Sequence, residues 1–415
     1  MRRLIVLVVA LASVAGACSS TKGQPTITIG SLYPKSGAQG VGGTDESRGA
    51  QLAVEWANAH GGINGKRIVL DSQDAPRAEA VPSVMAKLRH DGVSVVIGSH
   101  GSAISAAAGD AATTEHMSFW ETGAVGLVGP EVAGGSNFFR LAPMGSNLGQ
   151  AAIVFVRDQL AGHLPARPLR YAVAHVDDAY GRAVGGGAAA EVGMDPSATL
   201  VGTFPYDAST ADFGALATAI AAAKPDVLFV AAYLDDGIAL RRAVRAANVA
   251  LLANIGTSSS YCMPSFGEAL GDEAVGLFAS DKPDAADVRP DALAPEGRAA
   301  LAWVQSRYTD TWHEPMSAPA LSGFSNAFAL LVHVLPVSGR LSANEVAAAA
   351  LRVKLPPGTL ANGAGLDIAG PGAPDAGANR RAESVIWEWV APNTRAVVWP
   401  PAYANHPIVA PPPPT

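Results

Sequence analysis

Apolar and polar positions follow two alternating patterns along most of this chain. Short apolar runs are separated by alanine-rich stretches in which apolar residues recur every three or four positions. The runs predict strands and the stretches predict helices. We expect strands over residues 26–32, 67–71, 94–98, 171–176, 200–205 and 226–232. Such alternation predicts an α/β fold with parallel sheets that helices cover on both faces.

The segment from Ala50 to Asp74 contains one complete unit of this pattern. Apolar positions recur at helical spacing from Ala50 to Ala57, and the double glycine at 61–62 ends the helix. The dipeptide Asn64-Gly65 then makes a tight turn before the apolar residues 68–70. The local pattern therefore predicts a helix, a turn and a strand.

Length and composition indicate a globular protein of more than one domain. The 415 residues suffice for two domains, each with its own core. Hydrophobic residues make up 49% of the chain and charged residues 16%, which argues against disorder. The formal net charge is −7, so no basic field exists to attract nucleic acid.

The N-terminus has the features of an export signal over residues 1–17. Arg2 and Arg3 precede an apolar run, and small residues lead up to Cys18. The run is too short to span a membrane. Because Cys18 at the junction resembles the end of a bacterial lipobox, we expect a lipid anchor on this thiol, followed by a spacer over 18–24. Simple secretion is the alternative, since Ala15 stands where lipoboxes favour leucine.

The unit around the double glycine closely resembles a known family. Asn58, the string Gly61-Gly62-Ile63-Asn64-Gly65 and Asp71 match periplasmic-type binding proteins for branched-chain amino acids and amides, the extracellular receptors of ABC importers. Further segments follow in the family's order, so the resemblance covers roughly residues 25–340. These segments are 26–30, 93–108, 137–143, 176–184 and 224–233.

The resemblance implies two doubly wound parallel-sheet lobes joined by a hinge of several crossovers. The first lobe is expected over residues 25–143, with a return over 279–345, and the second over 144–278. A ligand would lie between the lobes, at the carboxyl ends of the strands.

The C-terminal part departs from the family pattern. We expect residues 346–402 to elaborate the second lobe and residues 403–415 to form a proline-rich tail. Two apolar runs around Pro392-Asn393 predict a β-hairpin. Its tryptophans are expected to serve packing, although a carbohydrate or partner surface is the alternative. These are Trp387, Trp389 and Trp399.

The expected ligand residues of the first lobe follow two strands. By resemblance, the Ser102 hydroxyl holds the ligand's carboxylate or carbonyl, although a serine at a helix start is also a common N-cap. The turn at Gly123 and Ala124 would complete this anion site, where Val125 replaces a usual threonine. Glu121 is expected to be a solvated turn carboxylate, or to contact a ligand amine.

The expected ligand residues of the second lobe are Tyr180, Tyr233 and Thr257. Both tyrosines match aromatics that the family closes over its ligand; core packing is the alternative. Amino-acid binders of the family have a glutamate that neutralises the ligand ammonium in the loop after the next strand. In this chain that loop begins with Gly256 and Thr257 and has no carboxylate. We therefore expect a ligand without a free α-ammonium, unless Glu121 or Asp235 replaces the glutamate. Asp235 and Asp236 are otherwise expected as helix caps.

The resemblance implies a receptor that delivers a small polar ligand to an ABC permease. Branched-chain or aliphatic amino acids, amides and small carboxylates are the candidates. We expect no catalysis, cofactor or metal, because the sequence lacks GxSxG, GxxxxGK[ST], HExxH and CxxC. We also expect a monomer. A ligand sensor for a signalling partner is one alternative. A hydrolase using Ser102 and His100 is another, but it lacks a third orienting group in the sequence.

Overall fold

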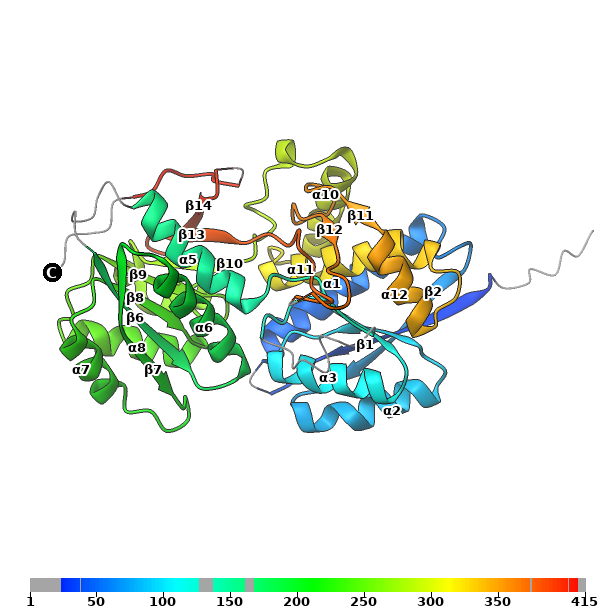
Figure 1. Ribbon diagram of the computed structural model, residues 1–415. Coiled ribbons are helices and arrows are strands. Elements are labelled where there is room, and N and C mark those ends of the chain that lie inside the picture. Colours follow the sequence, from blue (N-terminus) through cyan, green and yellow to red (C-terminus); the bar gives the residue numbers. More distant parts are fainter. Residues whose placement is uncertain are drawn as a thin grey trace, which may run out of the picture.

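The chain forms two α/β lobes that lie side by side (Figure 1). This computed structural model describes residues 24–37, 39–126, 137–160, 168–373, 375–401 and 403–409. The expected export signal, Cys18 and the last residues of the proline-rich tail lie outside the described residues.

The first lobe is built on a five-stranded parallel sheet with strand order β2-β1-β3-β4-β5. The strands are β1 (Thr26–Tyr33), β2 (Arg67–Asp74), β3 (Val95–Gly98), β4 (Ser118–Glu121) and β5 (Phe138–Arg140). Strands β3 and β4 and the second half of β1 are buried on both faces, as is usual for the inner strands of a parallel sheet, whereas the edge strand β2 is mostly exposed or half-buried.

Helices cover both faces of this sheet. One face packs against α2 (Val81–His90) and α3 (Ser102–Thr114). The other packs against α1 (Gly40–Ala59), α10 (Pro295–Trp312), α11 (Ala318–Phe328) and α12 (Ala343–Arg352). Helices α1 and α11 approach closely at Gly49, where a Cβ atom would lie 1.9 Å from the Ala320 carbonyl oxygen. The stretch Ala318–Val337 is apolar and long enough to cross a membrane, but 78% of it is buried in this core.

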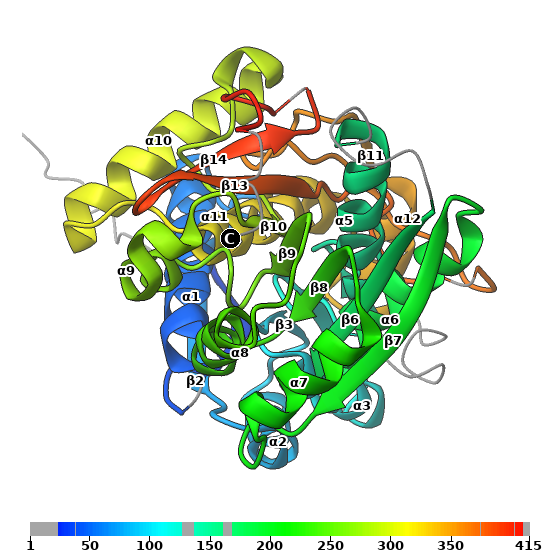
Figure 2. The ribbon, with the colours of Figure 1, turned by 90° about the vertical axis from the view of Figure 1, so that its left-hand side faces the viewer.

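The second lobe is built on a seven-stranded sheet with order β14-β13-β10-β9-β8-β6-β7 (Figure 2). Its parallel strands are β6 (Leu169–Val176), β7 (Ala198–Tyr206), β8 (Val227–Ala231), β9 (Ala253–Thr257) and β10 (Phe278–Asp281). Its helices are α5 (Gly145–Gln159), α6 (Ala179–Met194), α7 (Phe213–Ala223), α8 (Leu234–Ala246) and α9 (Pro264–Leu270).

The predicted C-terminal hairpin extends the second sheet. Strands β13 (Val385–Ala391) and β14 (Thr394–Trp399) pair antiparallel, and β13 also pairs antiparallel with β10. Asn393 makes the turn with a φ of 55°. Trp387 and Trp389 are each only 2% exposed, which confirms the packing role predicted for these two.

The chain crosses between the lobes three times: between β5 and α5, after β10, and between Asn379 and β13. The third crossover differs from the expectation that residues 346–402 elaborate the second lobe. Val346, Leu360 and Ile368 lie in the core of the first lobe instead. The proline- and glycine-rich segment before β13 therefore buries its apolar residues in the first lobe. Only from β13 onward does the C-terminal part extend the sheet of the second lobe. The short strands β11 (Lys354–Leu355) and β12 (Leu366–Asp367) order this segment.

Candidate functional site

The lobes meet at the carboxyl ends of their parallel strands. The loops after β1 and β4 in the first lobe contact the loops after β8 and β6 in the second. Gln39 Nε2 in the first lobe lies 3.4 Å from the Tyr233 hydroxyl in the second, and Gly126 lies against the Ala179 carbonyl. We call this region the inter-lobe site and define it by five residues. They are Ser102, Gly126, Tyr180, Tyr233 and Ser258.

Tyr180 and Tyr233 form an aromatic pair on the second lobe's side of the site. Their ring centroids are 5.3 Å apart. Tyr233 donates to Asp178 Oδ2 at 2.7 Å, and the Tyr180 hydroxyl lies 3.4 Å from Ser258 Oγ. Burial raises the pKa of both hydroxyls, so each keeps its proton at neutral pH, and Tyr233 donates its hydrogen bond to Asp178. The structure thus brings the two predicted tyrosines together. Tyr233 contacts the first lobe through Gln39, whereas Tyr180 is buried and packs in the core of the second lobe, as the core alternative expected.

Ser102 lies opposite this pair, at the start of α3. Its hydroxyl accepts a hydrogen bond from the Gly126 backbone N–H at 2.9 Å, and the residue is 6% exposed. The N-cap of α3 is Gly101, and no side chain caps it. Ser102 therefore joins the loops after β3 and β4, and the N-cap alternative does not describe it.

Glu121, the last residue of β4, is fully buried. Its Oε2 accepts from the Ser99 N–H at 2.9 Å, and its Oε1 accepts from the N–H groups of Gly123 and Ala124, each at 2.8 Å. The expectation of a solvated turn carboxylate is wrong. The two backbone donors expected to receive a ligand's carboxylate are already bonded to a carboxylate of the chain itself.

A second buried carboxylate, that of Glu46 in α1, lies beside this one. Its Oε1 accepts from Thr122 Oγ1 at 2.6 Å, and its Oε2 lies 2.9 Å from His100 Nδ1. Burial, and then the charge of Glu46, raise the pKa of Glu121. Sequence reasoning missed Glu46. Its position on the apolar face of α1, between Gly43 and Gly49, could have indicated a buried carboxylate.

The Glu46 contact bears on the hydrolase alternative. Glu46 is an acid that orients His100, which the sequence did not reveal. However, the Ser102 hydroxyl is engaged by Gly126, and no hydrogen bond joins His100 to Ser102 in the described part of the chain. His100 Nε2 packs against Gly42 instead. A nucleophile and base in contact, which acyl transfer needs, are thus not assembled.

Two buried cations lie on the crossovers beside the site. Lys282 donates from Nζ to the Gly123 carbonyl at 2.9 Å. Arg140 donates from Nη1 to the carbonyls of Val125 and Gly126, while its Nε and Nη2 have no hydrogen-bond partner within the described residues. Burial lowers the pKa of Arg140 to about 10, so the guanidinium is still charged at neutral pH.

Thr257 and the acids at the start of α8 turn away from the inter-lobe site. Thr257 is fully buried and donates from Oγ1 to the Ser280 carbonyl at 2.8 Å, so its hydroxyl joins two neighbouring strands. Asp236 accepts from the Tyr206 hydroxyl at 2.6 Å, and Asp235 is exposed in the first turn of α8. The expected ligand contact of Thr257 does not fit this geometry, because the sheet already uses its hydroxyl.

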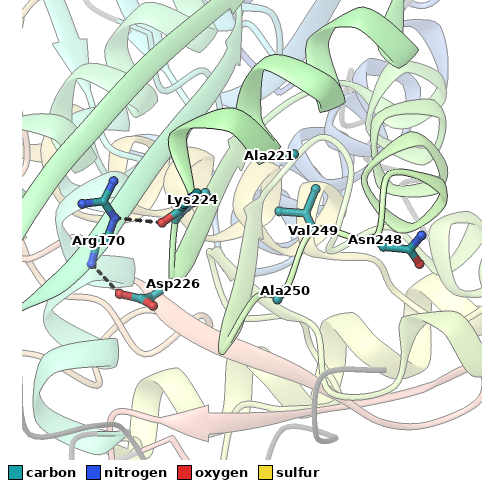
Figure 3. A pocket seen from close by; sticks show the side chains of 8 residues that line it. Arg170, Ala221, Lys224, Asp226, Asn248, Val249 and Ala250 are labelled. Atoms are coloured by element: carbon teal, nitrogen blue, oxygen red, sulfur yellow. Dashed lines mark hydrogen bonds between the residues drawn. The ribbon is translucent and has the colours of Figure 1, made fainter.

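A separate cavity of about 620 Å³ lies at the opposite edge of the second lobe (Figure 3). It is lined by residues before β6 and β8 and after α8, among them Lys224, Asn248 and Val249. The Arg170 side chain donates from Nε to the Lys224 carbonyl at 2.8 Å, and the Arg170 backbone N–H donates to Asp226 Oδ2 at 2.9 Å. These bonds tie strand ends together at the amino edge of the sheet, away from the inter-lobe site.

Known proteins resemble this chain in sequence and in fold. The chain is 28% identical over 264 residues to the Leu/Ile/Val-binding protein homolog 8 of Brucella abortus, a match that covers 61% of this chain and 64% of that protein. The chain therefore spans less than two thirds of that relative. The fold is similar to LivJ from Streptococcus pneumoniae, a branched-chain amino acid transporter substrate binding protein in complex with isoleucine. The TM-score is 0.69 at 20% identity, with 90% of this chain and 100% of that chain covered.

The fold is also similar to an ABC transporter solute binding protein from R. palustris in complex with benzoate. The TM-score is 0.70 at 16% identity, with 93% of this chain and 98% of that chain covered. The family model described as periplasmic binding protein matches residues 26–368, which takes in both lobes and the inter-lobe site. The chain belongs to the periplasmic binding protein family.

Proposed function

We propose that this protein is an extracytoplasmic solute-binding receptor that delivers a small polar solute to the permease of an ABC importer. The observation that carries the proposal is the inter-lobe site, in which the Tyr180 and Tyr233 pair lies opposite Ser102 at facing strand ends. Clefts at such strand ends are the usual ligand sites of parallel α/β sheets. Membership in the periplasmic binding protein family supports the same function.

Binding is proposed to close the lobes about the three crossovers. The Gln39 contact with Tyr233 joins the lobes, so it stabilises a closed arrangement and not an open one. Ser102, Gly123 and Ala124 contribute the wall on the first lobe, and Tyr180 and Tyr233 the wall on the second. The closed receptor, acting as a monomer, would then dock on its permease.

The solute is proposed to come from the classes that the resemblance implies. Isoleucine and benzoate are the solutes named for the two proteins of similar fold. No catalytic step is proposed, because the Ser102 hydroxyl and the His100 ring are not in contact in the described structure. Calorimetry tests the proposal. The protein is refolded from denaturant to strip bound solute and titrated with aliphatic amino acids, short amides and small carboxylates. Saturable one-to-one binding is expected; heats that never saturate across the panel would contradict the proposal.

We further propose that Cys18 carries a diacylglycerol anchor, because a basic start, an apolar run and small residues lead up to it. In a bacterial host fed labelled palmitate, the wild type should incorporate label and Cys18→Ser should not. The buried Cys262 supplies the matched control, since Cys262→Ser should label like the wild type. An unlabelled wild type released into the medium would overturn the anchor.

A further inference from the structure

The Glu121 carboxylate lies in a cradle of backbone donors. The N–H groups of Ser99, Gly123 and Ala124 converge on its two oxygens at 2.8 to 2.9 Å. Hydrogen bonds from N–H groups to an ionised carboxylate are short and strong, and three of them are what a bound anion would require. The chain satisfies all three donors internally.

We propose that Glu121 determines specificity by filling this anion cradle from within the chain, so that the receptor takes a neutral polar solute of the carboxamide or urea class in preference to a carboxylate. This inference rests on the proposed function. It concerns only which solutes the site admits.

The charges around Gly123 support the exclusion. A Cβ atom on Gly123 would lie 1.9 Å from Glu46 Oε2, while its N–H donates to Glu121. The Gly123 peptide therefore lies between two buried carboxylates. A solute carboxylate entering here would bring a third negative charge into a region of low dielectric, where like charges repel strongly.

Two buried cations in the same wall are matched in number by these two carboxylates, so no net positive charge remains to attract a solute carboxylate. Lys282 donates to the Gly123 carbonyl, and Arg140 Nη1 donates to the carbonyls of Val125 and Gly126. Their two positive charges balance the carboxylates of Glu46 and Glu121 within the wall. The unpartnered Nε and Nη2 of Arg140 are the one described feature that favours an anion, and the experiment below includes that outcome.

The five residues that define the inter-lobe site carry neutral groups, and the nearest carboxylate on the second lobe, that of Asp178, accepts from the Tyr233 hydroxyl. The hydroxyls of Ser102, Tyr180 and Ser258 and the faces of the two tyrosine rings offer hydrogen bonds and apolar contact without a full charge. A planar neutral amide matches such a lining, because it both donates and accepts and has no charge to desolvate.

Thermal unfolding of Glu121→Ala in sodium acetate tests the proposal without knowledge of the natural solute. The substitution empties the cradle, so acetate should raise the Tm of the variant saturably, while acetamide and sodium chloride at equal concentration should not. Wild-type Tm should not respond to acetate. The matched control is Glu388→Ala. It removes a buried carboxylate that accepts one N–H, from Val409, within the described residues, and acetate should not rescue this variant.

Two results would overturn the proposal. One is an acetate-induced rise in Tm that is as large in the wild type as in the variant, as expected if Arg140 binds anions. The other is a folded Glu121→Ala variant whose Tm does not change with acetate. If the variant does not fold in plain buffer, its refolding yield is measured with acetate and with acetamide. Recovery with acetate alone supports the proposal, and no recovery with acetate contradicts it.

Matched pairs then test selectivity in the wild type, namely isobutyramide against isobutyrate and benzamide against benzoate. We expect each amide to bind at least about tenfold more tightly than its acid. Tighter binding of the acids would overturn the inference yet leave the proposed receptor function intact. If no solute binds, the receptor function fails, while the acetate result still decides the role of the cradle.

Discussion

Hydroxyl groups at strand ends have contrasting partners in this protein. Thr257 donates within its own sheet, whereas the Tyr233 hydroxyl links Asp178 of its own lobe to Gln39 of the other. The same chemical change, removal of a hydroxyl, should therefore alter stability at one position and solute binding at the other.

At Thr257, substitution by valine should lower the free energy of unfolding and spare affinity. The change leaves the buried Ser280 carbonyl without this donor, which typically costs about 1–3 kcal/mol. Urea unfolding gives the stability, and calorimetry with a solute that binds gives the affinity, which should change less than about twofold. A tenfold weaker affinity at unchanged stability would restore Thr257 as a ligand residue.

At Tyr233, substitution by phenylalanine should weaken solute binding about five- to tenfold, because a net hydrogen bond between the closed lobes contributes about 1 kcal/mol. The control is Tyr171→Phe, which removes a buried hydroxyl of the same lobe at the start of β6. Calorimetry should show wild-type affinity for the control. Equal affinities for both variants would argue against a role of Tyr233 in closure.

Sequence reasoning located the tyrosine pair and Ser102 because each follows an apolar strand, and carboxyl ends of parallel strands meet at one edge. It did not predict that backbone N–H groups bind the Glu121 carboxylate. The three N–H groups come from two loops that are brought together only by the tertiary fold. Glu46 was missed for the same reason. Its partners His100 and Thr122 follow two different strands.

At the scale of elements, the C-terminal hairpin couples stability to pH. Glu388 in β13 is buried, and burial raises its pKa to about 7; burial and the nearby Asp284 likewise raise the pKa of Asp287 to about 7. The folded protein therefore holds protons that the unfolded chain releases near pH 4. The resulting stabilisation is full below about pH 4 and is lost as pH rises through about 7.

The Tm should therefore fall between about pH 5 and pH 8, and Glu388→Gln should reduce the slope, because the amide does not titrate. Asp287 and the other buried carboxyls with raised pKa values, Glu121 among them, account for the remaining part of the slope. Glu268→Gln, at an exposed side chain of α9, is the control and should retain the wild-type slope. The measurement is the Tm of the wild type and the two variants from thermal unfolding between about pH 5 and pH 8. A slope that Glu388→Gln leaves unchanged would mean that this carboxyl titrates normally in the folded state.

Elements with a strong local pattern were predicted well. The six expected strands and the hairpin are all present, with bounds that differ by a few residues. The segment 346–379 was assigned to the wrong lobe, because proline and glycine indicate where the chain turns and not which core receives the apolar residues between the turns. Leu360, Leu366 and Ile368 became informative only once α11 and α12 were in place beside them.

At the scale of the whole molecule, the proposed closure mechanism depends on three crossovers and the inter-lobe site. Two crossovers carry the buried cations Arg140 and Lys282, which donate to carbonyls of the loop after β4. The hinge is thus bonded to the wall that carries Glu121. A solute that contacts Tyr180, Tyr233 and Ser102 together binds both lobes at once and shifts the molecule toward the closed arrangement.

Small-angle X-ray scattering during a solute titration tests this account most directly. The protein is stripped by refolding, and the titrant is the tightest binder that calorimetry finds. The account predicts that the radius of gyration falls saturably, with the same midpoint as the binding heat, and that Tyr171→Phe behaves like the wild type. A radius of gyration that is unchanged at saturating solute would contradict closure of the two lobes about a bound solute.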